Sequence, residues 1–506
     1  MSASVVDIKL RFKYIYIACS PMTDIPLSIY YVFTMLSCTF VTLFFLPLLT
    51  LSAPSIQFPS SFGNNLQLAN VPTHPEVERS PADVPGSYVM TYFVDWAPRD
   101  NMNYALFDFI DFAFALPDAE FKLIFDSDNA PAMLRKLVKE AHGANTMVKL
   151  SIGGWTGSQY FSQAVSNAAN RKIFVDNIRA TYDEYDLDGI DIDWEYPGQT
   201  GRPGNSESPS DEENMLAFLQ LLRQSLPPGA KMSAAVQDTP FAGPNGQPIT
   251  DASEFAKCLD WILLMNYDDF QAANPPGPNA PLYDGCGQST QPSQNAAAGY
   301  NAWTSAGFPA NKMVLGIPGY GYVTNTGADH LRQRSPEAPR LHRLARRTTV
   351  NSDDDHQVQF RDLVSKGILQ RNDDGTYSAV PSSGFTRSWD KCSATPFLHS
   401  NTQTIPYDDP ESLGMKGAFA KKTGMLGVNM FDVHGETDQW DLITATRNTF
   451  LGPPSTPASD PASSLSPPGS PSTTTSDHDP SLSSPASPSE PAMPGDQQQG
   501  LMGPLA

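Results

Sequence analysis

The sequence is poor in basic residues for its length. Its 506 residues include 33 Lys and Arg against 54 Asp and Glu, which gives a formal net charge of −21. A chain with this excess of negative charge repels phosphate groups, so nucleic acid and an anionic membrane surface are unfavourable partners. A neutral substrate is compatible with the same composition.

Cysteine is also scarce, with five residues in the whole chain. Cys19 and Cys38 lie in an N-terminal segment that we expect to be removed. Cys286 and Cys392 lie in loops rich in Gly, Pro and Ser, whereas Cys258 directly precedes an apolar strand. We predict a Cys286–Cys392 disulfide and a buried free thiol at Cys258, with three reduced cysteines as the alternative.

Long apolar runs are absent except for residues 29–53. A run of this kind is typical of a signal peptide or a membrane anchor. We predict that residues 1–53 are a signal segment and that the protein is secreted, without stable membrane association. A start at Met35 would make residues 1–34 an over-long gene model, and a retained membrane anchor is the alternative.

Two further segments lack core-forming residues. Residues 54–85 are rich in Pro, Ser and Asn and are predicted to be a linker. Residues 451–506 consist largely of Pro, Ser and Thr, and cannot bury enough apolar surface to offset their chain entropy. We expect this tail to be disordered, and residues 86–450 to form a monomeric catalytic domain.

Short apolar strands alternate with helical patterns through residues 86–450. This alternation predicts a parallel sheet, and eight strands in one domain predict a closed (β/α)8 TIM barrel. An open doubly wound sheet is the alternative, but no Gly-rich dinucleotide motif follows the first strand. The predicted strands are 88–94, 107–115, 147–152, 189–195, 231–237, 261–267, 312–318 and 425–431.

Helix-start signals and one long interval refine this prediction. Ser210 with Glu213 matches a capping box before a helix over 211–226, and Asp409 followed by Pro410 indicates a second helix start. The interval 323–424 between the last two strands is too long for a plain connection, so it predicts a small insertion. It contains a basic stretch, 331–347, which we interpret as a solvated loop or a dibasic processing site.

Three carboxylates alternate along the strand GIDIDWE (189–195). Because successive side chains of a strand point to opposite faces, Asp191, Asp193 and Glu195 share one face. Crowding like charges raises the pKa of at least one member, which lets a carboxyl group keep a proton for acid catalysis. Glu195 lies at the carboxyl end of the strand, where barrel enzymes carry their active sites.

A calcium loop running from Glu184 to Glu195 is the competing interpretation of the same residues. The sequence disfavours it because the first ligand is Glu rather than Asp and the usually apolar eighth position is Asp191. Pro197 and the glycine after it also prevent a helix from leaving the loop.

The spacing Asp188-x-x-Asp191-x-Asp193-x-Glu195 resembles the signature of glycoside hydrolase family 18, the chitinases and their relatives. SIGGW (151–155) and MNYD (265–268) resemble the third-strand and sixth-strand motifs of that family, in the right order. The resemblance covers about 86–450 and implies a TIM barrel that cleaves chitin, of the secreted fungal type.

The resemblance also implies substrate-assisted, retaining catalysis. Glu195 would protonate the glycosidic oxygen and then act as base, while the substrate's acetamido carbonyl attacks the anomeric carbon. Asp193 would stabilise the acetamido nitrogen, with Asp191 and Ser151 tuning Asp193. Tyr267 would donate a hydrogen bond to the acetyl oxygen. Neither a metal nor a cofactor has a role in this scheme.

Chitin or a chito-oligosaccharide is therefore the expected partner. The resemblance, together with the expectation that aromatic rings stack on sugars, assigns substrate contacts to a further set of residues. They are Ser151, Gly153, Trp155, Tyr92, Asp268, Met265, Phe431, Trp96 and Trp389, with Phe241 as an additional stacking candidate.

Two positions depart from the family pattern. Phe431 occupies the place where the family usually has a Trp beneath the cleaved sugar, and Tyr322 stands where an Arg is common. Two alternatives to a chitinase stay open. They are an endo-β-N-acetylglucosaminidase acting on N-glycans and an inactive chitin-binding lectin on the same fold.

Overall fold

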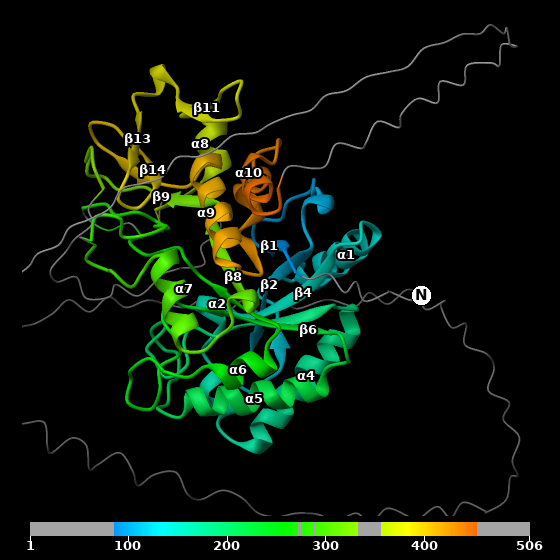
Figure 1. The fold of residues 1–506 in the computed structure, drawn as a ribbon. Helices are drawn as coiled ribbons and strands as arrows, with labels where there is room; N and C mark the ends of the chain where they lie inside the picture. The colour runs from blue at the N-terminus through cyan, green and yellow to red at the C-terminus, as the bar shows by residue number, and fades with distance from the viewer. Residues whose placement is uncertain (1–85, 272, 274, 288, 332–355, 453–506) are drawn as a thin grey trace, which may run out of the picture. The chain divides into compact units, whose positions relative to one another are not determined.

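The computed structural model describes residues 86–271, 273, 275–287, 289–331 and 356–452, drawn as a coloured ribbon in Figure 1. Eight parallel strands form one sheet, which closes on itself because β1 pairs with both β2 and β16. The predicted TIM barrel is confirmed. The barrel strands are β1 (Tyr88–Val94), β2 (Phe109–Pro117), β4 (Met147–Gly153), β5 (Gly189–Asp193), β6 (Lys231–Val236), β7 (Trp261–Leu264), β8 (Met313–Pro318) and β16 (Gly427–Phe431).

All eight strands lie where the sequence predicted them, although several end earlier. β5 ends at Asp193, and β7 ends at Leu264. The carboxylate motif of β5 therefore extends beyond its strand, so that Glu195 lies on the segment that leaves the barrel. The motif 265–268 lies wholly on the segment that follows β7. A short strand, β3 (Leu123–Ile124), pairs antiparallel with β2 at the same end.

Helices cover the outside of the barrel, with α1, α4 and α5 on one side in Figure 1. One face of α5 is apolar and buried, and it packs in the layer between strands and helices; its residues are Met215, Phe218, Leu219 and Leu222. The helices are α1 (Ala130–Gly143), α2 (Gly154–Gly157), α3 (Phe161–Val165), α4 (Ala168–Tyr185), α5 (Asp211–Ser225), α6 (Ser253–Cys258), α7 (Ala296–Ser305), α9 (Pro410–Thr423) and α10 (Asp441–Phe450).

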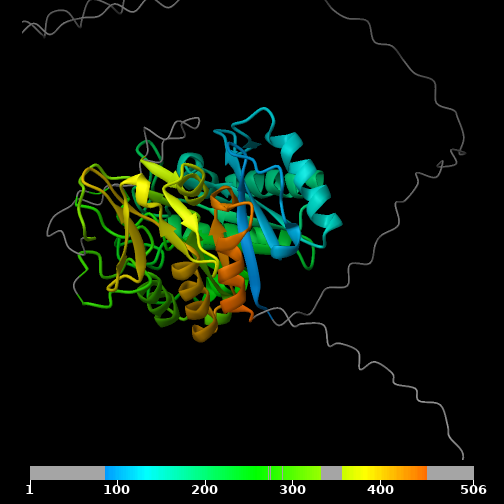
Figure 2. The same cartoon turned by 90° about the horizontal axis from the view of Figure 1, so that it is seen from above.

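The predicted insertion between the last two barrel strands is present. Figure 2, which looks from above, shows its yellow strands and helix gathered on one side of the barrel. It contains a three-stranded sheet with the order β13-β14-β15 and two smaller strand pairs. Its elements are β9 (Tyr320–Tyr322), β10 (Gln357–Gln359), α8 (Phe360–Ser365), β11 (Leu369–Arg371), β12 (Tyr377–Ala379), β13 (Thr386–Asp390), β14 (Thr395–His399) and β15 (Thr404–Pro406).

The disulfide prediction is confirmed. Cys286 and Cys392 are bonded, and the bond ties the long connection after β7 to the insertion. Cys258 is a buried free cysteine at the end of α6, as predicted.

Both predicted helix starts are confirmed, at Asp211 and at Pro410, but only one of the two predicted caps is present. The Asp409 side chain accepts hydrogen bonds from the backbone N–H groups of Glu411 and Ser412, and the Ser412 hydroxyl completes a capping box. At α5 the Ser210 side chain makes no capping hydrogen bond. The Ser210 backbone, with φ −95° and ψ 7°, is not in the extended conformation of a typical capping residue. The adjacent Asp211 carboxylate accepts from the N–H of Ser208 at 2.7 Å.

Several predictions concern residues outside the described ranges. These are the signal segment, the linker, the C-terminal tail and nearly all of the basic stretch 331–347, which all stay predictions. Within the ranges that the structure describes, the search for a helix of sufficient length and apolarity to span a membrane finds none.

Candidate active site

The three carboxylates of the β5 motif lie together inside the barrel. Asp191, Asp193 and Glu195 are 1%, 4% and 3% exposed. The alternate residues Ile190 and Ile192 belong to the apolar layer outside the strands. The alternation predicted from the sequence therefore places the acids inside and the aliphatic side chains outside.

The backbone of Glu195 is held after the strand has ended. Its N–H donates to the Ser158 hydroxyl at 2.9 Å, and its carbonyl accepts from the Asn205 side chain at 3.2 Å. The Ser158 hydroxyl in turn bonds the Gly154 carbonyl at 2.8 Å, at the start of α2. The Glu195 backbone is thus fixed from both sides, by segments that follow β4 and β5.

Gly153 has a backbone reason to be glycine. Its φ is +115°, and a Cβ built on it would lie 2.2 Å from the Asp193 carbonyl oxygen. Any side chain at this position would force β4 away from β5 at the level of the acids. The structure therefore assigns Gly153 to the close approach of two strands, and its predicted contact with substrate stays a prediction.

Asp191 receives three hydroxyl donors. Its Oδ2 accepts from Tyr92 at 3.0 Å and from Ser151 at 2.8 Å, and its Oδ1 accepts from Ser233 at 2.5 Å. Burial raises the pKa of Tyr92 well above its ordinary value, and the nearby Asp191 raises it further. Tyr92, which was predicted as a substrate contact, is thus a neutral hydrogen-bond donor that orients Asp191.

An ion pair that the sequence reasoning missed lies below this network. Nζ of Lys149 is 2.9 Å from Oδ1 of Asp111, and the ammonium stands 4.5 Å from the ring centre of Trp261. Asn429 donates to the other oxygen of Asp111 at 2.8 Å. The signal was available, because the two predicted strands that carry Asp111 and Lys149 are otherwise largely apolar.

An aromatic group adjoins the carboxylates at the carboxyl end of the barrel. The ring of Phe431, the last residue of β16, is stacked against Tyr267 at 5.8 Å between centroids. It also meets the Tyr92 ring edge-on at 5.3 Å. Tyr267 and Met265 are both buried in the inner apolar cluster of the barrel. The structure thus brings the motifs of β1, β7 and β16 together on the side of the acids.

Asp268 is held by two tyrosines of β9. Its Oδ1 accepts from the Tyr320 hydroxyl at 2.5 Å and from the Tyr322 hydroxyl at 2.7 Å. Asp268 has a φ of +64°, a conformation that non-glycine residues adopt rarely. Tyr322, the residue in place of the usual Arg, is thus a neutral hydrogen-bond donor to the carboxylate.

The predicted sugar-stacking aromatics have different surroundings. Trp96 is 39% exposed and stacks on Phe114 with 6.0 Å between centroids. Trp155 is buried in α2, and Trp389 lies on β13 with the Arg387 guanidinium 5.7 Å from its ring centre. Of these three, Trp96 is the most exposed.

Phe241 is a correction. It is buried against Phe255 and Trp303, at 4.7 and 5.1 Å between ring centroids. Because its faces are occupied by these core aromatics, we assign Phe241 to packing rather than to sugar stacking.

Asp188, the first acid of the motif, lies away from the other three. It precedes β5, where its Oδ2 accepts from the Val148 N–H and lies 2.8 Å from His142 Nε2. Asp188 therefore joins β4, β5 and α1 at the amino end of the barrel. Ligands of a calcium loop would have to come from both ends of β5, so the geometry disfavours that interpretation. Within the described ranges, no group of three His, Cys, Asp or Glu side chains is arranged to hold a metal ion.

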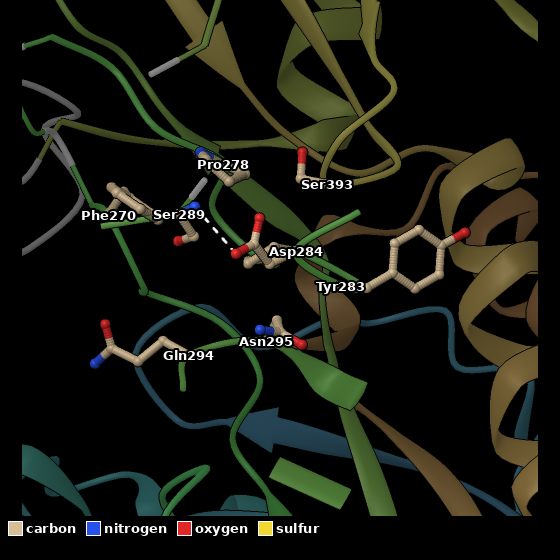
Figure 3. A pocket seen from close by; sticks show the side chains of 9 residues that line it. Phe270, Pro278, Tyr283, Asp284, Ser289, Gln294, Asn295 and Ser393 are labelled. Atoms are coloured by element: carbon tan, nitrogen blue, oxygen red, sulfur yellow. Dashed lines mark hydrogen bonds between the residues drawn. The ribbon is translucent and has the colours of Figure 1, made fainter. Parts of the chain in front are cut away.

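A small hollow lies apart from the carboxylates, between the connection after β7 and the insertion. Figure 3 shows Asp284 and Ser289 side by side in its lining, joined by a 3.1 Å hydrogen bond from the Ser289 N–H. None of the acids of β5 lines this hollow, so its chemistry is separate from theirs. Its lining consists of Phe270, Pro278, Pro281, Tyr283, Asp284, Ser289, Gln294, Asn295 and Ser393.

Comparison with known proteins points in one direction. The family model described as glycosyl hydrolases family 18 matches residues 88–436. A "chitinase-like effector" of Moniliophthora roreri is 33% identical over 384 residues, covering 71% of this chain and 91% of the relative. Chitinase A1 of Niallia circulans is 30% identical, covering 58% of this chain and 41% of the relative.

Solved structures agree with these sequence matches. A crystal structure of a chitinase from Rhizomucor miehei has a TM-score of 0.62 and 29% identity, covering 72% of this chain and all of that chain. A class V chitinase of Nicotiana tobaccum, solved as a mutant in complex with NAG4, has a TM-score of 0.58 and 24% identity. It covers 72% of this chain and 99% of that chain, and at this identity it supports the fold.

Proposed function

The chain belongs to family 18 of the glycosyl hydrolases, and from that premise we propose that it is a chitinase hydrolysing β-1,4 bonds between N-acetylglucosamine units. The observation that carries the proposal is the buried inner face of the β5 motif, where Asp191, Asp193 and Glu195 lie together. A general acid needs a carboxyl group in a restricted, water-poor place, and Glu195 has that place at the carboxyl end of the barrel.

The proposed reaction follows the substrate-assisted scheme. Glu195 gives its proton to the glycosidic oxygen as the bond from that oxygen to the anomeric carbon breaks. The acetamido carbonyl oxygen of the same sugar forms a bond to the anomeric carbon, and Asp193 stabilises the charge on the acetamido nitrogen. Water then replaces the acetamido oxygen and returns a proton to Glu195, so the configuration is retained.

The surrounding residues support these roles. Asp191, held by three hydroxyl donors, lies below Asp193 on the same face of β5. Tyr267 stands beside Phe431 and Tyr92, where its hydroxyl would meet the acetyl group of a bound sugar. Phe431 would then form the floor beneath that sugar, with a smaller ring than the usual Trp.

A second candidate function is recognition of chito-oligosaccharides without turnover. It is favoured by the names of two relatives at 33% and 31% identity, each a "chitinase-like effector". This chain carries both Glu195 and Asp193, which an enzyme needs and a binding protein does not. We therefore place hydrolysis first.

One assay series separates these functions. Purified protein should release reducing ends from colloidal chitin, leave fully deacetylated chitosan intact, and be inhibited by a thiazoline mimic of the cyclic intermediate. A high-mannose glycopeptide run in parallel tests the N-glycan alternative. Binding of chito-oligosaccharide with no release of reducing ends would favour the recognition function, and comparable cleavage of chitosan would exclude substrate assistance.

We also propose an extracellular location. The apolar run 29–53 at the start of the chain supports it, and so does a solid substrate such as chitin. N-terminal sequencing of protein recovered from the culture medium tests it. A mature start near residues 52–55 is expected, whereas protein retained in the membrane fraction would favour the anchor.

A further inference from the structure

Burying the Lys149–Asp111 ion pair costs desolvation free energy, and the packing of β2 against β4 does not require the pair. Both side chains are 1% exposed, with 2.9 Å between Nζ and Oδ1. A buried ion pair contributes little net stability compared with apolar residues of the same volume, because both charges lose their hydration. β2 and β4 are apolar on their outer faces, and an apolar pair in the interior would serve packing as well. Its position under the active site provides another reason for the pair.

A chain of hydrogen bonds connects Lys149 to Asp191. Nζ of Lys149 donates to the Ser233 hydroxyl at 2.5 Å, and this hydroxyl donates to Asp191 Oδ1 at 2.5 Å. The direct distance from Nζ to the same Oδ1 is 3.9 Å. An ammonium has protons to give and no lone pair to accept one, so it directs the Ser233 proton toward Asp191. Asp191 is then an acceptor in its contact with Ser233.

Asp191 is surrounded by hydroxyl groups, by two further carboxylates and by one ammonium. Tyr92 faces it from β1, Asp111 from β2, Ser233 from β6 and Asp193 along its own strand, and Lys149 from β4 is the cation among them. Tyr267, after β7, lies near Tyr92 in the same cluster. Without the ammonium, the acids of this cluster would share a low-dielectric interior, and at least one would take up a proton.

We infer that Lys149 is a positioning residue that acts through Ser233 to orient Asp191 and places a positive charge close to the acids of β5. Asp111 opposes this effect, because its carboxylate offsets part of the ammonium charge while keeping the ammonium in place. Burial raises the pKa of Asp111 to about 6, although the neighbouring Lys149 lowers it. The inference rests on the proposed hydrolytic function and adds a second layer of residues to it.

The test is the pH profile of kcat/KM, measured on a short acetylated chito-oligosaccharide for the whole chain. Lys149→Met removes the cation and should move the midpoint of the acidic limb to higher pH by about one unit, the lower end of what a neighbouring charge does. Asp111→Asn keeps the shape of the side chain but removes its negative charge. It should move the same midpoint to lower pH, by a smaller shift than that of Lys149→Met. The double variant should return toward the wild-type midpoint.

The intermediary role of Ser233 has its own variant. Ser233→Ala should shift the acidic limb in the same direction as Lys149→Met, and the two substitutions together should shift it no further than Lys149→Met alone. The matched control is the exposed ion pair of α4, in which Nζ of Lys172 lies 2.6 Å from Asp176 Oδ2. Lys172→Met and Asp176→Asn should leave the profile unchanged.

Opposite shifts from the two charge variants support the inference, since loss of packing alone has no reason to reverse sign. The inference is overturned if the acidic limbs of Lys149→Met and Asp111→Asn coincide with that of the wild type, or if both variants shift the midpoint in the same direction. Should Lys149→Met fail to fold, Asp111→Asn decides alone, and an unmoved midpoint overturns the inference. A wild-type protein without hydrolytic activity removes the proposed function and this inference together, whereas active wild type with coincident limbs removes the inference alone.

Discussion

Strand β5 and its extension face two different environments. On the outside, Ile190, Ile192 and Trp194 pack in a continuous apolar layer, where the Trp194 ring is stacked on Phe161 at 5.3 Å. On the inside, the alternate positions are acids whose neighbours are hydroxyls, an ammonium and aromatic edges. Stability comes from the first face and chemistry from the second, and one period-2 pattern provides both. Substitutions on the two faces should therefore change different measurable properties.

The largest effect is expected on the inner face. Glu195→Gln keeps the size of the side chain but removes the transferable proton, so turnover should fall by roughly 10²–10⁴-fold, the usual contribution of a general acid. Initial rates on a chromogenic chito-oligosaccharide measure it, with thermal melts to show that the variant is folded. Glu213→Gln, on an exposed position of α5, is the matched control. Near wild-type turnover in folded Glu195→Gln protein would exclude this residue as the acid.

A substitution on the outer face of β5 should lower stability and leave turnover unchanged. Ile192 is fully buried between β5 and the helices, so Ile192→Ala leaves a cavity and should lower the free energy of unfolding by about 2–5 kcal/mol. Chemical denaturation measures it, and turnover per folded molecule should stay unchanged. Ile173→Ala, on a residue 47% exposed on α4, is the control and should cost little. A drop in turnover with unchanged stability would show that the two faces are not separate.

A third prediction uses a buried acid at the rim of the barrel. Burial raises the pKa of Asp432 from 3.8 to about 7. An acid with a raised folded-state pKa contributes stability that is fully present below the unfolded value and is lost as pH rises through the folded value. The free energy of unfolding should therefore fall between pH 4 and pH 8, by up to about 4 kcal/mol from this group.

Asp432→Asn should flatten that fall, because the amide does not ionise and its oxygen can still accept from the His434 N–H. Urea unfolding at several pH values measures the slope, with exposed Asp100→Asn as control. Part of the fall should remain, since burial also raises the pKa of Glu436 to about 8. An identical slope in wild type and Asp432→Asn would show that Asp432 titrates normally.

The smallest effect concerns the aromatic floor. Phe431→Trp enlarges the ring that lies between Tyr92 and Tyr267, and should tighten binding of a chito-oligosaccharide to a catalytically inactive variant. Aromatic contacts contribute about 0.5–1.5 kcal/mol beyond buried area, which corresponds to roughly 2- to 10-fold in Kd. Isothermal titration measures it, and Phe431→Leu should weaken binding. Weaker binding by the Trp variant at unchanged stability would show that the ring faces the core.

Much of the fold follows from patterns that act locally along the chain. Eight apolar runs separated by helical stripes indicated the barrel, because a parallel strand must be covered on both faces. The Asp409 cap was predictable because the side chain bonds groups only two and three residues away. At Ser210 the predicted helix start was right and the predicted side-chain cap was wrong. A cap also depends on the backbone conformation of the capping residue, and the φ of −95° and ψ of 7° at Ser210 are not visible in a motif match.

The sequence by itself determined which face of β5 carries the acids, because side-chain direction along a strand depends only on alternation. It also contained the charges of Lys149 and Asp111. The tertiary structure alone decided that these two residues, 38 positions apart, meet each other and reach Asp191 through Ser233. It decided as well that Phe241 is enclosed while Trp96 stays open. Alternation is a property of the local backbone, whereas the partner of a buried charge or ring depends on how eight strands close around a common interior.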